Sequence, residues 1–251
     1  MLIKQNYTFM KQHFNTVIIA VGIILAAIIL GGSWKRTHVG NESISVTGLS
    51  KQDFVSDLIV WDGYFTAESM STKEAYAQLK TDAEVIKNYL IGKGIKEKEI
   101  IFSSVNISSD YEYVNNKEGG STRQFKGYIL TQNLKVESKE VDKIESISRE
   151  VSELIDLGVN FVSSAPEYYY TKLAELKIKM LSSATEDARI RAEAIAQNAK
   201  SSLGKLKRAD MGIFQITAQN SSEEYTYGGA FNTSSKNKTA SVTVRLDFGI
   251  N

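Results

Sequence analysis

An unbroken apolar segment near the amino terminus constrains this chain more than any other feature. Residues Val17–Leu30 read VIIAVGIILAAIIL and include no polar side chain. Extended to Trp34, the segment forms about 27 Å of α-helix at about 1.5 Å per residue, close to the roughly 30 Å hydrocarbon core of a bilayer. A soluble helix that is apolar on every side would need protein all around it. We therefore expect a transmembrane or signal-anchor helix over residues 17–34.

Positive charges flank this segment on both sides. Lys4 and Lys11 precede it, and Lys35 and Arg36 follow it, so the positive-inside rule favours a cytoplasmic amino terminus by a narrow margin. The small residues Gly31–Ser33 leave signal-peptide cleavage as the alternative to an uncleaved anchor. The side chains expected in lipid or at its interface are Val17, Ile18, Ile19, Val21, Ile23, Ile24, Leu25, Ile28, Ile29, Leu30 and Trp34.

The domain organisation follows from the position of the anchor. Residues 1–16 are expected to form a short cytoplasmic amino terminus, 35–42 a linker and 43–249 one exported domain. The chain has no cysteine, which excludes disulfides, thiolate metal sites and cysteine nucleophiles. An exported domain without disulfides fits a bacterial envelope, so we expect a single-pass inner-membrane protein with a periplasmic domain, or a periplasmic protein if the segment is cleaved. With 30 basic and 29 acidic residues, bulk charge gives no reason to expect nucleic acid as a partner.

Hydrophobic periodicity predicts an α+β domain with a largely antiparallel sheet or sheets, three helices and the element order ββα ββ αβα ββ. Gly48, Gly92 and Gly204 are expected to end the first strand, the first helix and the third helix. Ser71 and Glu74 have the spacing of a capping box. The expected strands cover residues 43–48, 54–67, 100–107, 124–136, 159–163, 211–218 and 240–248. The expected helical stripes cover residues 76–90, 141–154 and 181–203, and polar loops are expected over 110–122 and 219–238.

Histidine-based chemistry is nearly excluded. The only histidines, His13 and His38, fall before the apolar segment and in the linker, where no rigid frame would hold them. We expect no catalytic residue, no metal and no cofactor. A carboxylate-dependent hydrolase acting on glycans stays as an alternative, and its candidate residues are Asp57, Asp62, Glu68 and Asp110.

Aromatic residues in polar segments are candidate contact residues, because tyrosine combines a planar apolar body with a polar tip. Tyr168–Tyr170 are instead expected to cover the domain's own core. A basic stretch with Lys205, Lys207 and Arg208 is expected to be a solvated helix end. The candidate contact residues, for an envelope protein or a glycan, are Tyr111, Tyr113, Tyr225, Tyr227 and Phe231.

Several short motifs occur in a recognisable order. They include Val46-Thr47-Gly48 at the first strand, Gly127-Tyr128, the helix residues Ala184, Asp187-Ala188 and Ala192-Glu193-Ala194, and then Leu203-Gly204-Lys205. In this order and spacing the chain resembles, over residues 43–249, the SIMPL-domain family of bacterial envelope proteins, which includes a periplasmic immunogenic protein that assembles into channel-like oligomers. Ser56-Asp57 and Asp110-Tyr111 depart from the family's Pro-Asp and Pro-Tyr pairs.

The resemblance implies an α+β envelope domain that forms homo-oligomers and has no established catalytic site. We therefore expect a non-catalytic, membrane-anchored envelope protein whose domain binds or self-assembles, with a connection to envelope stress implied by the resemblance alone. A signalling adaptor is a further alternative that rests on the family's name.

Overall fold

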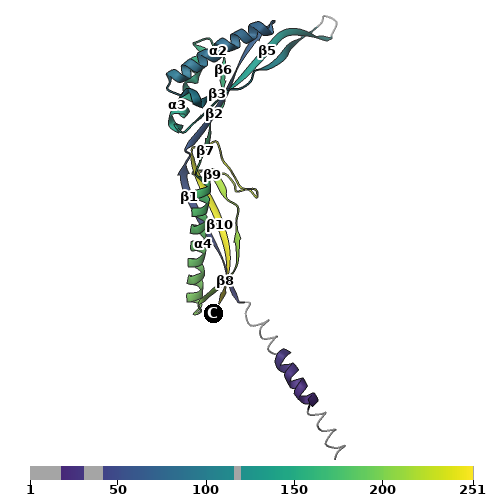
Figure 1. The fold of residues 1–251 in the computed structure, drawn as a ribbon, viewed down its shortest axis with the longest axis vertical. Helices are drawn as coiled ribbons and strands as arrows, with labels where there is room; N and C mark the ends of the chain where they lie inside the picture. Colours follow the sequence, from purple (N-terminus) through teal and green to yellow (C-terminus); the bar gives the residue numbers. More distant parts are fainter. Residues whose placement is uncertain (1–17, 31–41, 116–119, 251) are drawn as a thin grey trace, which may run out of the picture. The chain divides into compact units, whose positions relative to one another are not determined.

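The computed structural model describes residues 18–30, 42–115 and 120–250 (Figure 1). Over these residues the chain is an α+β protein with two antiparallel sheets and four helices, which confirms the predicted fold class. The strands are β1 (Ser43–Val55), β2 (Leu58–Ser69), β3 (Ile100–Phe102), β4 (Asn106–Asn115), β5 (Ser121–Ser138), β6 (Phe161–Ser163), β7 (Glu167–Tyr169), β8 (Leu203–Met211), β9 (Gln215–Ala218) and β10 (Asn237–Ile250). The helices are residues 18–30, α2 (Thr72–Gly92), α3 (Val141–Glu150) and α4 (Leu173–Asn198), with short 3-10 turns at Glu97–Glu99 and Val151–Ile155.

The apolar segment is helical from residue 18 to residue 30, and every side chain in that range is exposed. Val17 and Trp34, the two ends of the predicted anchor side chains, lie outside the described residues. In the described part of the chain, no helix has both the length and the hydropathy needed to cross a membrane. The membrane-spanning segment over residues 17–34 therefore stays a prediction.

The described chain divides into two compact units. Unit 1 comprises the described residues up to Leu49 with Ala184–Gly212 and the chain from Val244 onward, and unit 2 comprises Ser50–Ser183 and Ile213–Thr243. The boundaries fall inside β1, α4 and β10.

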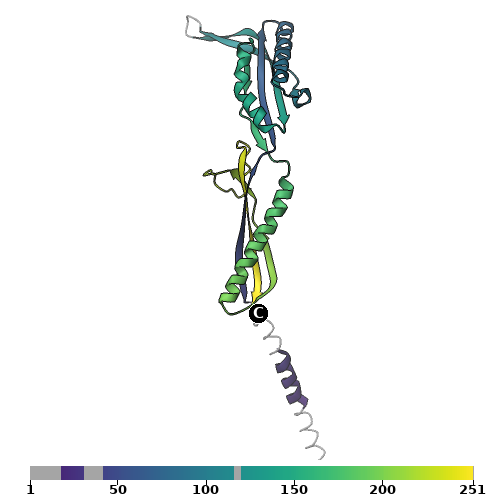
Figure 2. The same cartoon turned by 90° about the vertical axis from the view of Figure 1, so that its left-hand side faces the viewer.

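Unit 2 contains a six-stranded antiparallel sheet with its core on one face. The strand order is β3-β5-β2-β6, with β4 also paired to β5 and β7 also paired to β2. Side chains alternate along β2, so Ile59, Trp61 and Phe65 point to one face and are almost completely buried. Leu79 of α2 and Ile144 of α3 join the same core, so both helices cover that face (Figure 2).

In unit 1, α4 packs against the first part of β1 through small residues. Ala184, Ala188 and Ala192 are buried at successive turns, as the predicted alanine stripe requires. An added Cβ on Gly48 would lie 2.1 Å from the carbonyl oxygen of Ala184 and 2.5 Å from the amide nitrogen of Ala188. Asp187 fixes this contact, because its carboxylate accepts a 2.9 Å hydrogen bond from the amide of Leu49.

The sequence predicted that Gly48 ends the first strand, and this prediction is wrong. β1 continues to Val55, and the segment predicted as one strand over 54–67 is broken at Ser56-Asp57. There the amides leave the sheet pattern: Ser56 N–H donates to the carbonyl of Lys236 and Asp57 N–H to the carbonyl of Tyr169. The glycine is needed for the approach of α4 and not for a turn.

The predicted helix ends also need correction. α2 ends at Gly92 with Lys93 as its C-cap, and the residue with positive φ is Gly94. The capping box does not form, because Glu74 accepts a hydrogen bond from Ser69 Oγ instead.

α4 ends at Asn198, and not near Leu203 as predicted. The chain turns through Lys200, whose φ is 58°, before Leu203 and Gly204 begin β8. The basic residues predicted at a helix end, Lys205, Lys207 and Arg208, therefore lie on a strand.

Three predicted segments differ from the structure, because the strands do not begin and end where the apolar runs do. The segment 100–107 splits into β3 and β4, and 211–218 splits between β8 and β9. Most of the predicted polar loop 110–122 is strand, because β4 and β5 continue their pairing out to Asn115 and Ser121.

Candidate functional site

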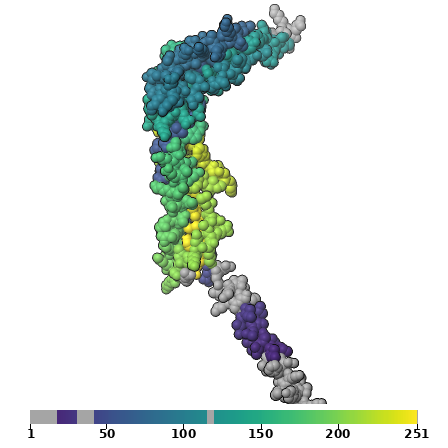
Figure 3. All heavy atoms as spheres, in the orientation of Figure 1, coloured from purple at the N-terminus to yellow at the C-terminus, as the bar shows by residue number. Residues whose placement is uncertain are grey.

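The distal halves of β4 and β5 form a two-stranded ribbon that projects from unit 2 (Figure 1), and its atoms form the teal projection in Figure 3. β2 ends at Ser69, opposite Tyr128 of β5, and the β4–β5 pairing continues beyond that point to Asn115 and Ser121. An isolated two-stranded ribbon has little stability of its own in water. Its side chains are therefore available for contacts outside the unit.

Aromatic rings form a row along one face of this ribbon. Tyr111 lies opposite Phe125 with ring centroids 5.6 Å apart, and Phe125 lies 5.2 Å from Tyr128. The guanidinium of Arg123 stacks 3.6 Å from the centroid of Tyr111, and Tyr113 lies opposite Arg123 with 71% of its surface exposed. We call these five residues the ribbon row.

A β-bulge places the ribbon row on the core face of the sheet. The register shifts between Asp110 and Tyr111, so that Lys126 is the extra residue on β5. Tyr128 has the same parity as the buried Leu130 on β5, and the bulge brings the odd-numbered Phe125 to the same face. The ribbon row is thus a continuation of the core face beyond its helix cover.

The predicted contact residues Tyr111 and Tyr113 therefore lie side by side on β4, in strand and not in a loop. Sequence reasoning missed their partners Arg123, Phe125 and Tyr128. The available signal was the break in alternation at Lys126-Gly127, where a glycine with φ of 148° packs against the carbonyl of Ser69.

The remaining predicted contact residues lie in the loop between β9 and β10. Tyr225 is exposed and Tyr227 is fully exposed, whereas Phe231 forms a bridge with Ile216 and is about half exposed. Gln215 stabilises the loop, because its side-chain oxygen accepts hydrogen bonds from the amides of Thr226 and Ala230. The structure does not bring this loop's aromatics into the ribbon row.

A buried lysine supports the same loop. Lys238 is 2% exposed, and its ammonium donates to the backbone carbonyl of Asn232. Burial lowers the pKa of Lys238 to about 8. Glu223 ties the loop to β9 by accepting from the amide of Ala218 and the side-chain amide of Asn232.

Of the three neighbouring tyrosines after Pro166, Tyr168 covers the core as predicted, whereas Tyr169 donates a hydrogen bond to Glu167. Tyr168 is buried in the core, and Tyr170 packs against Phe54 with ring centroids 4.9 Å apart.

The four candidate carboxylates do not all converge on one site, although Asp110 and Glu68 both lie near Lys126 and raise its pKa. Asp57 accepts hydrogen bonds from the amide and hydroxyl of Thr171, and Asp110 pairs with Lys126 at 3.2 Å. Asp62, which the alternation of its strand placed on a partly buried face, is exposed. Glu68, on the same strand, is exposed as well. Within the described ranges, histidine, aspartate and glutamate form no group of three that could hold a metal ion, and His13 and His38 lie outside them.

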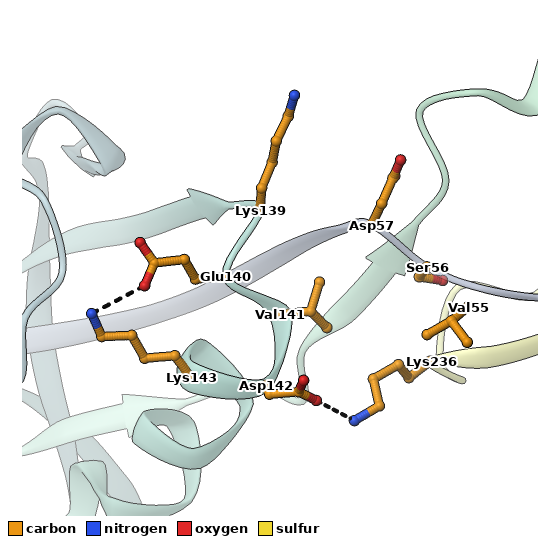
Figure 4. Close-up of a pocket in the computed structure, with 9 residues that line it drawn as sticks. All are labelled: Val55, Ser56, Asp57, Lys139, Glu140, Val141, Asp142, Lys143 and Lys236. Carbon is orange, nitrogen blue, oxygen red and sulfur yellow. Dashed lines mark hydrogen bonds and ion pairs between the residues drawn. The ribbon is translucent and has the colours of Figure 1, made fainter.

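Unit 2 contains an open, charged cleft of about 520 Å³ (Figure 4). Its walls are the β1–β2 junction, the turn from β5 into α3, and Lys236 just before β10. Lys236 donates to Asp142 at 2.7 Å and to Glu145 at 2.9 Å, and this ammonium lowers the pKa of Glu145.

The comparison with known families identifies the chain. The family model described as "SIMPL: Protein of unknown function (DUF541)" matches residues 44–248. The chain therefore belongs to the SIMPL family, as its motifs had indicated. No curated protein sequence matches it.

Proposed function

We propose that this chain is a membrane-anchored cell-envelope protein whose SIMPL domain acts by binding or self-assembly and not by catalysis. The observation that carries the proposal is the ribbon row. In the ribbon row, the core face of the six-stranded sheet continues without a helix over it. Its aromatic side chains and arginine are residue types enriched at protein interfaces.

The proposed occupant of the ribbon row is a second copy of the chain. An edge-to-face ring contact and a cation–π contact already orient Tyr111, Phe125 and Arg123, so little side-chain freedom would be lost on association. The ion pair between Asp110 and Lys126 favours this reading over the carboxylate hydrolase.

The anchor part of the proposal is supported by the helix at residues 18–30. Its apolar side chains are between 50% and 69% exposed, and that much isoleucine and leucine surface is unfavourable in water. We propose an inner-membrane location with a cytoplasmic amino terminus and a periplasmic domain. Cleavage after Gly31–Ser33 would release the same domain into the periplasm.

Light scattering coupled to size-exclusion chromatography on the full chain in a mild detergent tests self-assembly. We expect an oligomer that the paired change Tyr113→Ser and Phe125→Ser shifts toward monomer. Tyr76→Ser, at an exposed tyrosine on α2, is the matched control and should leave the oligomer intact. A strict monomer at high protein concentration would contradict the proposal.

Membrane fractionation with mass spectrometry of the native amino terminus tests the anchor. An intact amino terminus in the membrane fraction supports the uncleaved form, and a terminus near residue 33 in the periplasm supports the cleaved form. An intact chain in the soluble cytosol would contradict both.

A further inference from the structure

The cleft of Figure 4 contains charges of both signs, and most of them are already paired with one another. Lys143 donates to Glu140 at 3.1 Å, and Lys236 pairs with Asp142 at 2.7 Å. Lys96 approaches Glu140 from outside the cleft at 2.9 Å. Lys236 also pairs with Glu145 at 2.9 Å, so the three lysines and three carboxylates of these pairs leave no net charge on the side walls.

Lys139 and Asp57 are the exceptions. No ion pair joins them, and Lys139 has no hydrogen-bond or ion-pair partner in the part of the chain that the structure describes. Figure 4 shows both side chains extending the same way from the two sides of the cleft and away from Val141, which lies below the gap between them. Val141 is buried at the start of α3 and gives the cleft a short apolar floor.

Thr171 holds the carboxylate of Asp57 in place but leaves acceptor positions on it free. Its two carboxylate oxygens each accept one hydrogen bond of 2.7 Å, from the amide and the hydroxyl of Thr171. A carboxylate has about four acceptor positions, so both oxygens can accept a further donor from the cleft.

We propose that this cleft binds a zwitterionic ligand of amino-acid or short-peptide size. The ligand's carboxylate lies on the ammonium of Lys139, and its ammonium lies on the carboxylate of Asp57. A simple anion on Lys139 would face the uncompensated charge of Asp57, and a simple cation on Asp57 would face Lys139. A ligand with both charges satisfies both walls, and a volume of about 520 Å³ is in the range of small-molecule sites.

Ser56 also lines the cleft, but it is only 4% exposed and its hydroxyl oxygen is itself buried. Figure 4 shows this hydroxyl pointing away from Lys139 and Asp57, so the proposal rests on those two side chains and not on Ser56. The proposal does not depend on the ribbon row, which is on other residues.

Titration calorimetry of the full chain in mild detergent tests the proposal with three related probes. The probes are the zwitterionic dipeptide Ala-Ala, its N-acetylated form, which is only an anion, and its C-terminal amide, which is only a cation. We expect Ala-Ala to bind and each blocked form to bind at least about tenfold more weakly, because each loses one charge-assisted hydrogen bond.

Variants locate the site. Lys139→Met should weaken Ala-Ala binding about tenfold or more while leaving the fold unchanged, because Lys139 is exposed and unpaired. Asp57→Asn should do the same, and its melting temperature reports whether the contact with Thr171 survives. Lys80→Met, at an exposed lysine on α2, is the matched control and should bind like the wild type.

Three results would overturn the proposal. They are no heat of binding with Ala-Ala, equal affinity for the N-acetylated form, and binding that Lys139→Met leaves unchanged. None of these results bears on the oligomeric state, so failure here is distinguishable from failure of the self-assembly proposal.

Discussion

The two units cover their sheets with helices of opposite composition. In unit 2, α2 buries large side chains, Leu79, Ile86 and Leu90, which fill the space between helix and sheet. In unit 1, α4 buries only alanines, and Gly48 of β1 lies so close to the helix that an added Cβ would be 2.1 Å from the carbonyl oxygen of Ala184. The packing of α2 depends on large side chains that fill the space above the sheet. The packing of α4 depends on small residues that let the helix and the strand approach closely. The two should therefore respond to substitution in opposite directions.

The largest expected effect is at Gly48. Gly48→Ala should lower the free energy of unfolding by more than about 3 kcal/mol, because helix backbone atoms and not flexible side-chain ends would have to move. Chemical denaturation of the full chain in detergent measures this change. Gly92→Ala is the control: nothing lies within 4 Å of its added Cβ, and we expect a gain of roughly 0.5–1 kcal/mol. Equal tolerance at the two glycines would remove the basis of the comparison.

The reverse substitution is costly in α2. Leu90→Ala should cost about 2 to 3 kcal/mol by leaving a cavity, at the low end of the usual range because Leu90 lies in the last turn of the helix, where neighbours can move inward. Leu90→Met, which keeps the volume, should cost less than about 1.5 kcal/mol. The same denaturation experiment separates the two, and a Leu90→Ala variant as stable as the wild type would show that this core is not filled.

A smaller, pH-dependent effect is expected from Lys238. Its pKa is about 8 in the folded chain, against about 10.4 in an unfolded one, because burial disfavours the charged amine. Below pH 8 both states carry the proton and the cost of burial is fully present. Between about pH 8 and 10.4 the unfolded chain binds more protons, so this group raises stability as the pH rises.

Lys238→Met should remove that rise. The measurement is the melting temperature of the wild type minus that of the variant across pH 7 to 10.5, which should become more positive toward the alkaline end. Lys80→Met is the control and should run parallel to the wild type. If the difference in melting temperature between wild type and Lys238→Met does not change with pH, burial does not lower the pKa of this amine.

The smallest effect on stability is expected in the ribbon row, which belongs to neither kind of packing. Tyr113→Ser should change the free energy of unfolding by no more than about 0.5 kcal/mol, because the side chain is mostly exposed. Its effect should be on the oligomeric state alone. A large loss of stability in the monomer would assign Tyr113 to the domain's own fold.

Periodic sequence patterns predicted the covered parts of the fold. The 3/4 spacing of Val141, Ile144 and Ile147 identified the buried face of α3, and the alternation along residues 240–248 identified β10. Tyr76 was assigned to the same stripe as Leu79 but is exposed, because α2 buries Ala75 and Asp82 at that level. An error of one position arises when the buried face of a helix is inferred from residue types alone, because the direction of the neighbouring strand also decides which side chains are covered.

The candidate sites were less predictable, because they depend on register. The sequence identified Tyr111 and Tyr113 as contact residues but could not pair them with Arg123 and Phe125, which requires the bulge at Lys126. Nor could it bring Lys139, Asp57 and Ser56 to one cleft, since these residues come from segments about eighty positions apart.

By itself the sequence determined the fold class, the family and the apolar amino-terminal helix, because these depend on composition and on local periodicity along the chain. Only the tertiary structure decided why Gly48 is needed, which face carries the aromatic row, and where unpaired charges meet. Each of these depends on how far one backbone lies from another. That distance is set by long-range strand register and helix packing, which no single segment of sequence contains.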